Sequence, residues 1–122
     1  MEPEILGDLP AHVLQRLGIA TLARAVWLGA DAITHIRHQR DVSARDAELV
    51  LATLRRGTFD PVYGGSDRAD VRRFVVVEYV SERPLWACLS LKIVWAGTSQ
   101  SGADEIWVNT GFPLGLESLT DY

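Results

Sequence analysis

The chain has 122 residues, of which 48% are hydrophobic and 23% charged, a size and composition typical of one folded domain. Its formal net charge of −4 excludes nucleic-acid binding by a generally basic surface, so such a function would require a local patch or brief contact. The single cysteine excludes an internal disulfide. The sequence contains no run of about 18 apolar residues, so no membrane-spanning helix is predicted.

Helical spacing and capping residues predict three helices in the N-terminal half. They span 10–16, 31–39 and 44–56. Pro10 can occupy the first turn of the first helix, and Asp31 and Ser43 are the expected N-caps of the other two. Residues 1–9 are expected to form a polar lead-in, and residues 23–28 a short strand between the first two helices.

β-Branched and aromatic residues dominate the second half, which predicts consecutive strands. The expected strands span 58–63, 72–80, 85–95 and 105–110. Residues 64–67 form an expected turn, and residues 113–122 a loose tail. Helices followed by strands predict one α+β domain over residues 1–122, with N-terminal helices packed on a C-terminal antiparallel sheet of about four strands.

Two of the three histidines, His35 and His38, lie three residues apart in the second predicted helix and therefore share a face. Histidine is the side chain that changes charge most readily near neutral pH, so this pair is a candidate proton-transfer site. In the alternative interpretation, one histidine packs at the edge of the core and the other is solvated. A zinc site is not expected, because metal-binding helices use a spacing of four and no third ligand follows at a suitable distance.

Lys92 is the only lysine in the chain and lies in the middle of a predicted strand. Alternation places it opposite an apolar face, either as a solvated side chain or as a point charge for a phosphate oxygen. In the last predicted strand, alternation places Thr110 on the same face as Val108 and opposite Asn109. The Thr110 hydroxyl can lie at the sheet edge, or Thr110 can be an ordinary strand residue before a glycine turn.

Five segments of the sequence share their order and spacing with a known nuclease superfamily. They are GDLPAHVLQRLGI (7–19), VWLGADAITHIRHQR (26–40), AELVLATLRRG (47–57), LSLKIVWAG (89–97) and EIWVNTGF (105–112). Together they combine a helix with an H-x-x-H pattern, a second helix, a strand with a central lysine and a closing V-x-T. In this arrangement the chain resembles the phage-associated members of the barnase/EndoU/colicin/RelE-like (BECR) nuclease superfamily.

The resemblance implies a microbial-ribonuclease-like fold and an endoribonuclease that needs no metal or other cofactor. In such enzymes the RNA 2′-hydroxyl attacks the adjacent phosphate and leaves a cyclic phosphate product. Carried over to this sequence, His35 or His38 transfers the proton, and His38 matches the family position more closely. Lys92 stabilises the phosphate charge, and Thr110 hydrogen-bonds the phosphate or orients the nucleophile. The candidate substrate-binding residues are Arg37, Arg72, Arg73 and Asn109.

The same resemblance implies RNA as the partner, with tRNA as one candidate, and a phage virion or immunity protein as a second kind of partner. The acidic N-terminus does not resemble a signal peptide, so the expected location is the cytoplasm of a bacterial host or the virion, without a membrane. The main alternative is a catalytically inactive, phage-associated structural or protein-binding module on the same fold. A partner-binding protein such as an antitoxin or inhibitor is a third interpretation, which the acidic charge suits, whereas RNA-cleaving toxins are often basic.

Overall fold

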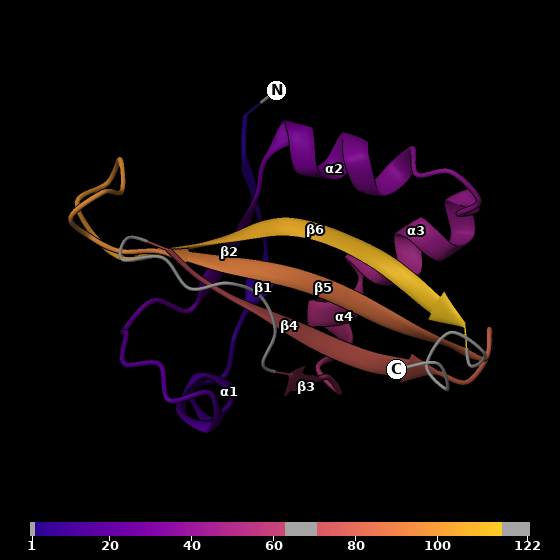
Figure 1. Cartoon of the computed structure of the whole chain (residues 1–122), viewed down its shortest axis with the longest axis horizontal. Helices are drawn as coiled ribbons and strands as arrows, with labels where there is room; N and C mark the ends of the chain where they lie inside the picture. Colours follow the sequence, from indigo (N-terminus) through magenta and orange to yellow (C-terminus); the bar gives the residue numbers. More distant parts are fainter. Residues whose placement is uncertain (1, 63–70, 116–122) are drawn as a thin grey trace.

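The computed structural model describes residues 2–62 and 71–115, which form four helices and one β-sheet (Figure 1). The helices are α1 (Ala11–Arg16), α2 (Ala30–Arg37), α3 (Ala44–Leu51) and α4 (Thr53–Arg56). The strands are β1 (Glu4–Asp8), β2 (Ala25–Leu28), β3 (Asp60–Val62), β4 (Val71–Val80), β5 (Leu85–Val94) and β6 (Glu105–Gly115). The predicted α+β class is confirmed, and none of the described helices is long and apolar enough to cross a membrane. The predicted turn at 64–67 and the end of the predicted tail, 116–122, lie outside the described residues.

Among the described residues, the sheet has six strands in the order β1-β2-β6-β5-β4-β3. It is mixed, because β2 runs parallel to β6 while the other neighbours are antiparallel. The prediction of an antiparallel sheet of about four strands is therefore wrong in the number of strands and in this one pair. The expected polar lead-in contains β1, which pairs with β2 and buries Leu6. The sequence did not predict β1, because only one of its five residues is buried and a single buried residue gives no recognisable alternation.

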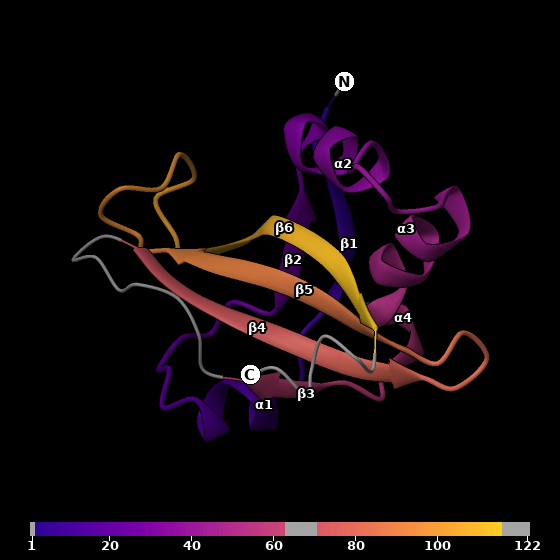
Figure 2. The ribbon, with the colours of Figure 1, turned by 45° about the vertical axis from the view of Figure 1, so that its right-hand side comes forward.

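The two faces of the sheet differ in what covers them. On one face, alternate residues of β5 are buried beneath the helices, and a Cβ added to Gly111 would lie 2.7 Å from Val50 of α3. Figure 2 shows α3 and α4 on this side of the sheet. The other side carries Arg73, Lys92 and Trp107 as directly paired neighbours on β4, β5 and β6. We call it the open face because no helix within residues 2–62 and 71–115 packs on it.

An irregularity in β6 changes which residues share the open face. Val108 pairs with Leu91. The next pair is Thr110 with Ser90, so Asn109 is an extra residue, as in a β-bulge. Directly paired residues point to the same face, so Thr110 joins Ser90 on the open face and does not follow Val108 inward. The alternation predicted for this strand is wrong at Thr110 for this reason.

The outer edge of β6 brings α2 to the sheet. β2 pairs with β6 at only two positions, so the rest of β6 has no strand on its outer side among the described residues. β6 continues to Gly115, so the prediction that it ends at Thr110 is wrong. Pro113 lacks a backbone N–H, and the strand can contain it because no described strand pairs with this part of the outer edge. α2 follows this edge in Figure 1, and the Gln39 side chain after it donates to the Gly111 carbonyl at 2.6 Å.

The third predicted helix is divided into α3 and α4. The backbone N–H of Asp46 donates to the Ser43 hydroxyl at 3.1 Å, which confirms Ser43 as the N-cap of α3. The division falls at Ala52. There the Thr53 hydroxyl donates to the Val50 carbonyl at 2.8 Å and competes with regular helical bonding.

The ends of α2 separate the two histidines. Its N-cap is Gly29, and Asp31 lies in its first turn instead of capping it. The helix ends at residue 37, so His38 is its C-cap and has left the helical conformation, with φ −117° and ψ 26°. His35 therefore has a position inside the helix, whereas His38 lies at its end.

Candidate anion-binding site

A cavity of about 300 Å³ opens between the first turn of α2 and the middle of β5 and β6. It is lined by Gly29, Ala30, Asp31, Ala32, Lys92, Trp107, Val108 and Asn109. The path of α2 along the edge of β6 brings the helix here, and the β-bulge contributes Asn109. The cavity thus joins a helix N-terminus, the only lysine of the chain and a side-chain amide.

The α2 end of the cavity offers backbone N–H groups. Gly29 caps the helix without a side-chain acceptor, and the Ile33 N–H donates to the Gly29 carbonyl at 3.1 Å. The N–H groups of the first turn have no acceptor within a helix, and the helix dipole adds partial positive charge there. The exposed carboxylate of Asp31 lies in the same turn and offsets part of this charge.

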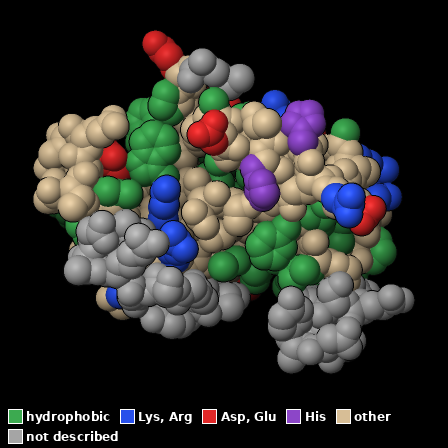
Figure 3. Space-filling view, turned by 45° about the horizontal axis from the view of Figure 1, so that its top comes forward, with side chains coloured by type: hydrophobic (Ala, Val, Ile, Leu, Met, Phe, Trp, Pro, Cys, Tyr) green, Lys and Arg blue, Asp and Glu red, His purple; other side chains and the backbone are tan. Residues whose placement is uncertain are grey.

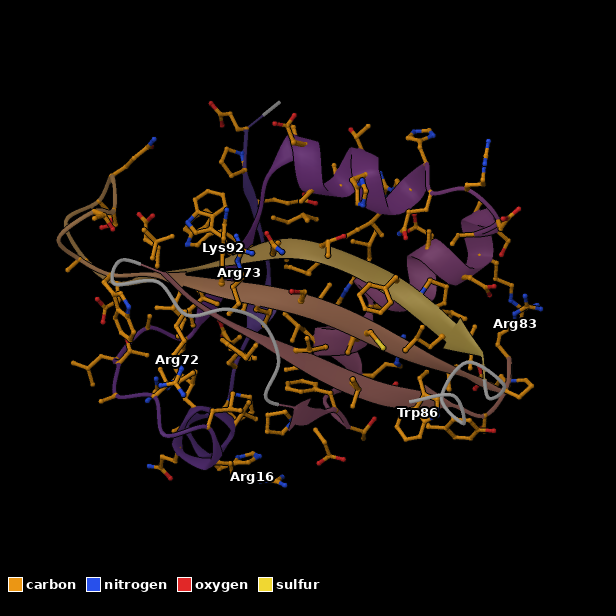
Figure 4. The ribbon with its side chains drawn as sticks, viewed as in Figure 1. Arg16, Arg72, Arg73, Arg83, Trp86 and Lys92 are labelled. Atoms are coloured by element: carbon orange, nitrogen blue, oxygen red, sulfur yellow. The ribbon has the colours of Figure 1, made fainter. Side chains whose placement is uncertain are left out.

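Two cations lie side by side on the open face. Arg73 and Lys92 are directly opposite on β4 and β5, and Figure 4 shows them close together at the end of the sheet away from Arg83. Within residues 2–62 and 71–115, neither Lys92 nor Arg73 forms an ion pair or a side-chain hydrogen bond. Like charges directly opposite each other destabilise a sheet, and a bound anion would remove that repulsion.

Four of the predicted site residues lie in or beside this cavity. Lys92 and Asn109 line it, and Arg73 is the cross-strand neighbour of Lys92. Thr110 follows Asn109 and lies on the open face because of the β-bulge. The structure therefore brings together one predicted catalytic cation, one predicted hydroxyl and two predicted substrate-binding residues.

Two predicted substrate-binding arginines lie elsewhere. Arg72 points to the helix-covered face, donates to the Leu17 carbonyl at 2.9 Å, and lies beside α1 in Figure 4. Adjacent strand residues point to opposite faces, so Arg72 and Arg73 cannot both contact one substrate on the open face. Arg37 forms an ion pair with Glu48 of α3 at 2.8 Å. Both arginines thus connect structural elements and are not part of the cavity.

The two histidines lie at different distances from the cavity. His35 lies one turn after the cavity residue Asp31, about 6 Å along the helix axis, whereas His38 lies about 10 Å along it. Both side chains are exposed, and neither forms a hydrogen bond with another described residue. Figure 3 shows purple histidine side chains on the same surface as a blue basic group, with other surface between them. His35 is therefore the nearer of the two predicted proton-transfer residues.

Trp107 is the main site residue that sequence reasoning missed. Its indole lines the cavity and two neighbouring hollows of about 280 and 420 Å³. The indole N–H donates to Glu105 at 3.1 Å, and the ring lies 6.1 Å from that of Trp27, tilted by 32°. The only signal in the sequence is an aromatic residue two positions before Asn109, since its proximity to Lys92 depends on the strand register.

Two titratable groups of β5 and β6 have shifted pKa values. Hydrogen bonds from Ser101 and from the Trp107 indole lower the pKa of Glu105 and thus favour its ionised form. Burial raises the pKa of the Cys88 thiol to about 11, which leaves little thiolate to act as a nucleophile. The described residues contain no group of three or more His, Cys, Asp or Glu placed to hold a metal ion.

The arrangement is suited to an anion with several oxygens. Lys92 and Arg73 supply positive charge, the first turn of α2 supplies N–H donors, and Asn109 supplies an amide. A scan against protein-family models, a search of curated proteins and a search of solved structures each found no match to this chain.

Proposed function

We propose that the chain is a metal-independent endoribonuclease that binds an RNA phosphate in the cavity at the start of α2. The observation that carries this proposal is the meeting of Lys92, Asn109 and the first turn of α2 in one cavity, with Arg73 beside Lys92. The resemblance to phage-associated BECR nucleases supports the same assignment, because it gives Lys92 and Thr110 roles at a phosphate.

The groups around the cavity complement the charge of a phosphate. N–H groups at a helix N-terminus bind phosphate oxygens, and Lys92 adds a compact positive charge. These contacts strengthen as negative charge increases on the phosphorane, so they stabilise the transition state more than the bound RNA. The Asn109 amide and the Thr110 hydroxyl donate to the remaining oxygens or orient the 2′-hydroxyl.

The reaction also needs two proton-transfer groups. One group takes the proton of the 2′-hydroxyl as its oxygen bonds to phosphorus, and the other protonates the 5′-oxygen as its bond to phosphorus breaks. Asp31 and His35, one turn apart on α2, are the base and the acid in this scheme. The products are a 2′,3′-cyclic phosphate and a free 5′-hydroxyl.

Incubation of the purified protein with total RNA and with tRNA in EDTA tests this function. We expect cleavage that leaves 2′,3′-cyclic phosphate ends, with losses of about a hundredfold or more in Lys92→Gln and in His35→Gln. The matched control is Arg16→Gln, because Arg16 is the last residue of α1, contacts Asp60 at 3.5 Å and lies away from Lys92 in Figure 4. Equal cleavage by wild type and both site variants would indicate a contaminating nuclease and overturn the proposal.

A catalytically inactive, phage-associated binding module is the second candidate. It is favoured by the exposed histidines, because no hydrogen bond to another described residue orients either side chain for proton transfer. Such a module would bind its partner through Lys92 and leave RNA intact. Lys92-dependent binding of RNA without any cleavage product would support it over the enzyme.

A further inference from the structure

The indole of Trp107 lies where the cavity meets the two neighbouring hollows. It is half-buried, and its ring is held by the hydrogen bond to Glu105 and by contact with Trp27. The two rings are tilted to each other and their centroids lie 6.1 Å apart, so they do not form parallel walls for a ring inserted between them. A planar ligand would therefore stack on the accessible part of Trp107.

Trp107 is also the cross-strand neighbour of Lys92. Directly opposite residues on one face of an antiparallel pair have Cβ atoms about 5 Å apart. A phosphate held by Lys92 would thus place an attached nucleoside within reach of the indole. Figure 3 shows basic side chains directly beside hydrophobic ones on this surface.

The charges on the two sides of Trp107 give the ligand a direction. On one side, Lys92, Asn109 and the N-terminus of α2 line the cavity and favour the phosphate there, and Asp31 offsets only part of this positive charge. On the other side, Gln100, Asp104 and Glu105 line the hollow of about 420 Å³, where the carboxylates repel phosphate and accept hydrogen bonds from base N–H groups. Lys92 also lines the smaller hollow of about 280 Å³, so this separation of charge applies to the larger one. The phosphate and the base therefore favour opposite sides of the same indole.

We propose that Trp107 is a stacking site for one base of single-stranded RNA whose phosphate is bound at Lys92. This inference rests on the proposed function, because it starts from a phosphate in that cavity. Stacking needs an accessible base face, which a single strand offers and a duplex does not. A contact through one base and few phosphates also suits a chain with a net charge of −4.

Binding of an uncleavable ligand tests the stacking site without requiring catalysis. The probe is a fluorescent 2′-O-methyl RNA octamer of mixed sequence, and the readout is its anisotropy. We expect Trp107→Leu to weaken binding by about tenfold or more and Trp107→Phe to weaken it less. Trp86→Leu is the matched control, because Trp86 lies on the open face at the other end of β5 in Figure 4 and is expected to change affinity less than twofold.

An abasic octamer separates stacking from a loss of folding. Wild type should bind this backbone at least tenfold more weakly than the complete octamer, and Trp107→Leu should bind both oligomers about as tightly as wild type binds the abasic one. Equal affinity of wild type for both oligomers, or an unchanged affinity in Trp107→Leu, would overturn the stacking site. Binding of a duplex as tightly as the single strand would also overturn the stacking site.

The two proposals fail in different ways. RNA cleavage with an unchanged KM in Trp107→Leu would retain the nuclease and remove the stacking site. Base-dependent binding that requires Trp107, without cleavage of any RNA, would retain the stacking site and remove the nuclease. Absence of both binding and cleavage would overturn both.

Discussion

Lys92 and Trp107 are directly opposed on β5 and β6, and both point to the open face of the sheet. The pair combines a positive charge with an aromatic ring, and these two groups recognise the two chemically different parts of a nucleotide. Both residues lie within strands paired on the two sides of their positions, so their spacing is set by backbone hydrogen bonds and not by a loop.

The Lys92→Gln variant should change how binding depends on salt. If Lys92 and Arg73 each neutralise one phosphate, the slope of log K against log salt should be about −1.4 in wild type and about −0.7 in the variant, since each phosphate on a single strand contributes about −0.7. Anisotropy titrations of the octamer at several salt concentrations measure both slopes. Arg73→Gln should give the same reduced slope, whereas a slope unchanged in both variants would contradict the phosphate contact.

The Asp31→Asn variant should separate binding from cleavage. Removing this carboxylate takes a negative charge out of a cavity that also contains Lys92, so the octamer should bind severalfold more tightly. Cleavage should fall by about a hundredfold or more, because the amide cannot accept the 2′-hydroxyl proton. Parallel affinity and single-turnover measurements test this, and tighter binding together with faster cleavage would exclude Asp31 as the base.

The Gly111→Ala variant should lower the free energy of unfolding by about 1–3 kcal/mol. The added methyl would lie 2.7 Å from Val50 and 3.1 Å from Leu89, so α3 or β6 would have to move. Urea titration monitored by tryptophan fluorescence measures the loss. Gly97→Ala is the control, because an added Cβ at Gly97 meets nothing within 4 Å, and an equal loss there would contradict the packing explanation.

The Asp46–Arg83 pair should give stability that depends on pH. The Arg83 guanidinium donates to Asp46 at 2.8 and 3.2 Å and lowers the pKa of that carboxyl below its ordinary value of about 3.9. A lowered folded-state pKa stabilises the protein above the unfolded-state value, and the contribution is lost as pH falls through the folded-state value. The stability difference between wild type and Asp46→Asn should be constant from about pH 5 to 7 and shrink below about pH 4.

Arg83→Gln provides the matching variant for this pair. It removes the same contact from the other side, so thermal unfolding should show the same decline of its effect toward low pH. The effect should be small, because exposed ion pairs contribute little and the Arg83 side chain is 37% exposed. A difference that grows as pH falls would contradict the assigned direction of the pKa shift.

The sequence was informative where pattern and local chemistry agree. Alternation identified β5 and the side of it that carries Lys92, and Ser43 was recognisable as a cap. The β-bulge at Asn109 was not recognisable, because an extra residue appears only when β6 is aligned against β5. The same alignment brings Trp107 to Lys92. Alternation does show that Arg72 and Arg73 point apart, so only one of them could have been assigned to the site.

The hydrogen bond from the Gln39 side chain to the Gly111 carbonyl also protects the edge of β6 from self-association. An uncovered strand edge offers a row of N–H and carbonyl groups to which another polypeptide can add. α2 and Gln39 lie along that edge of β6, and the first turn of the same helix forms one wall of the cavity. Loosening α2 would therefore disrupt the candidate site and expose the edge of β6 to strand addition at the same time, so a loss of the proposed binding and self-association should arise from the same event.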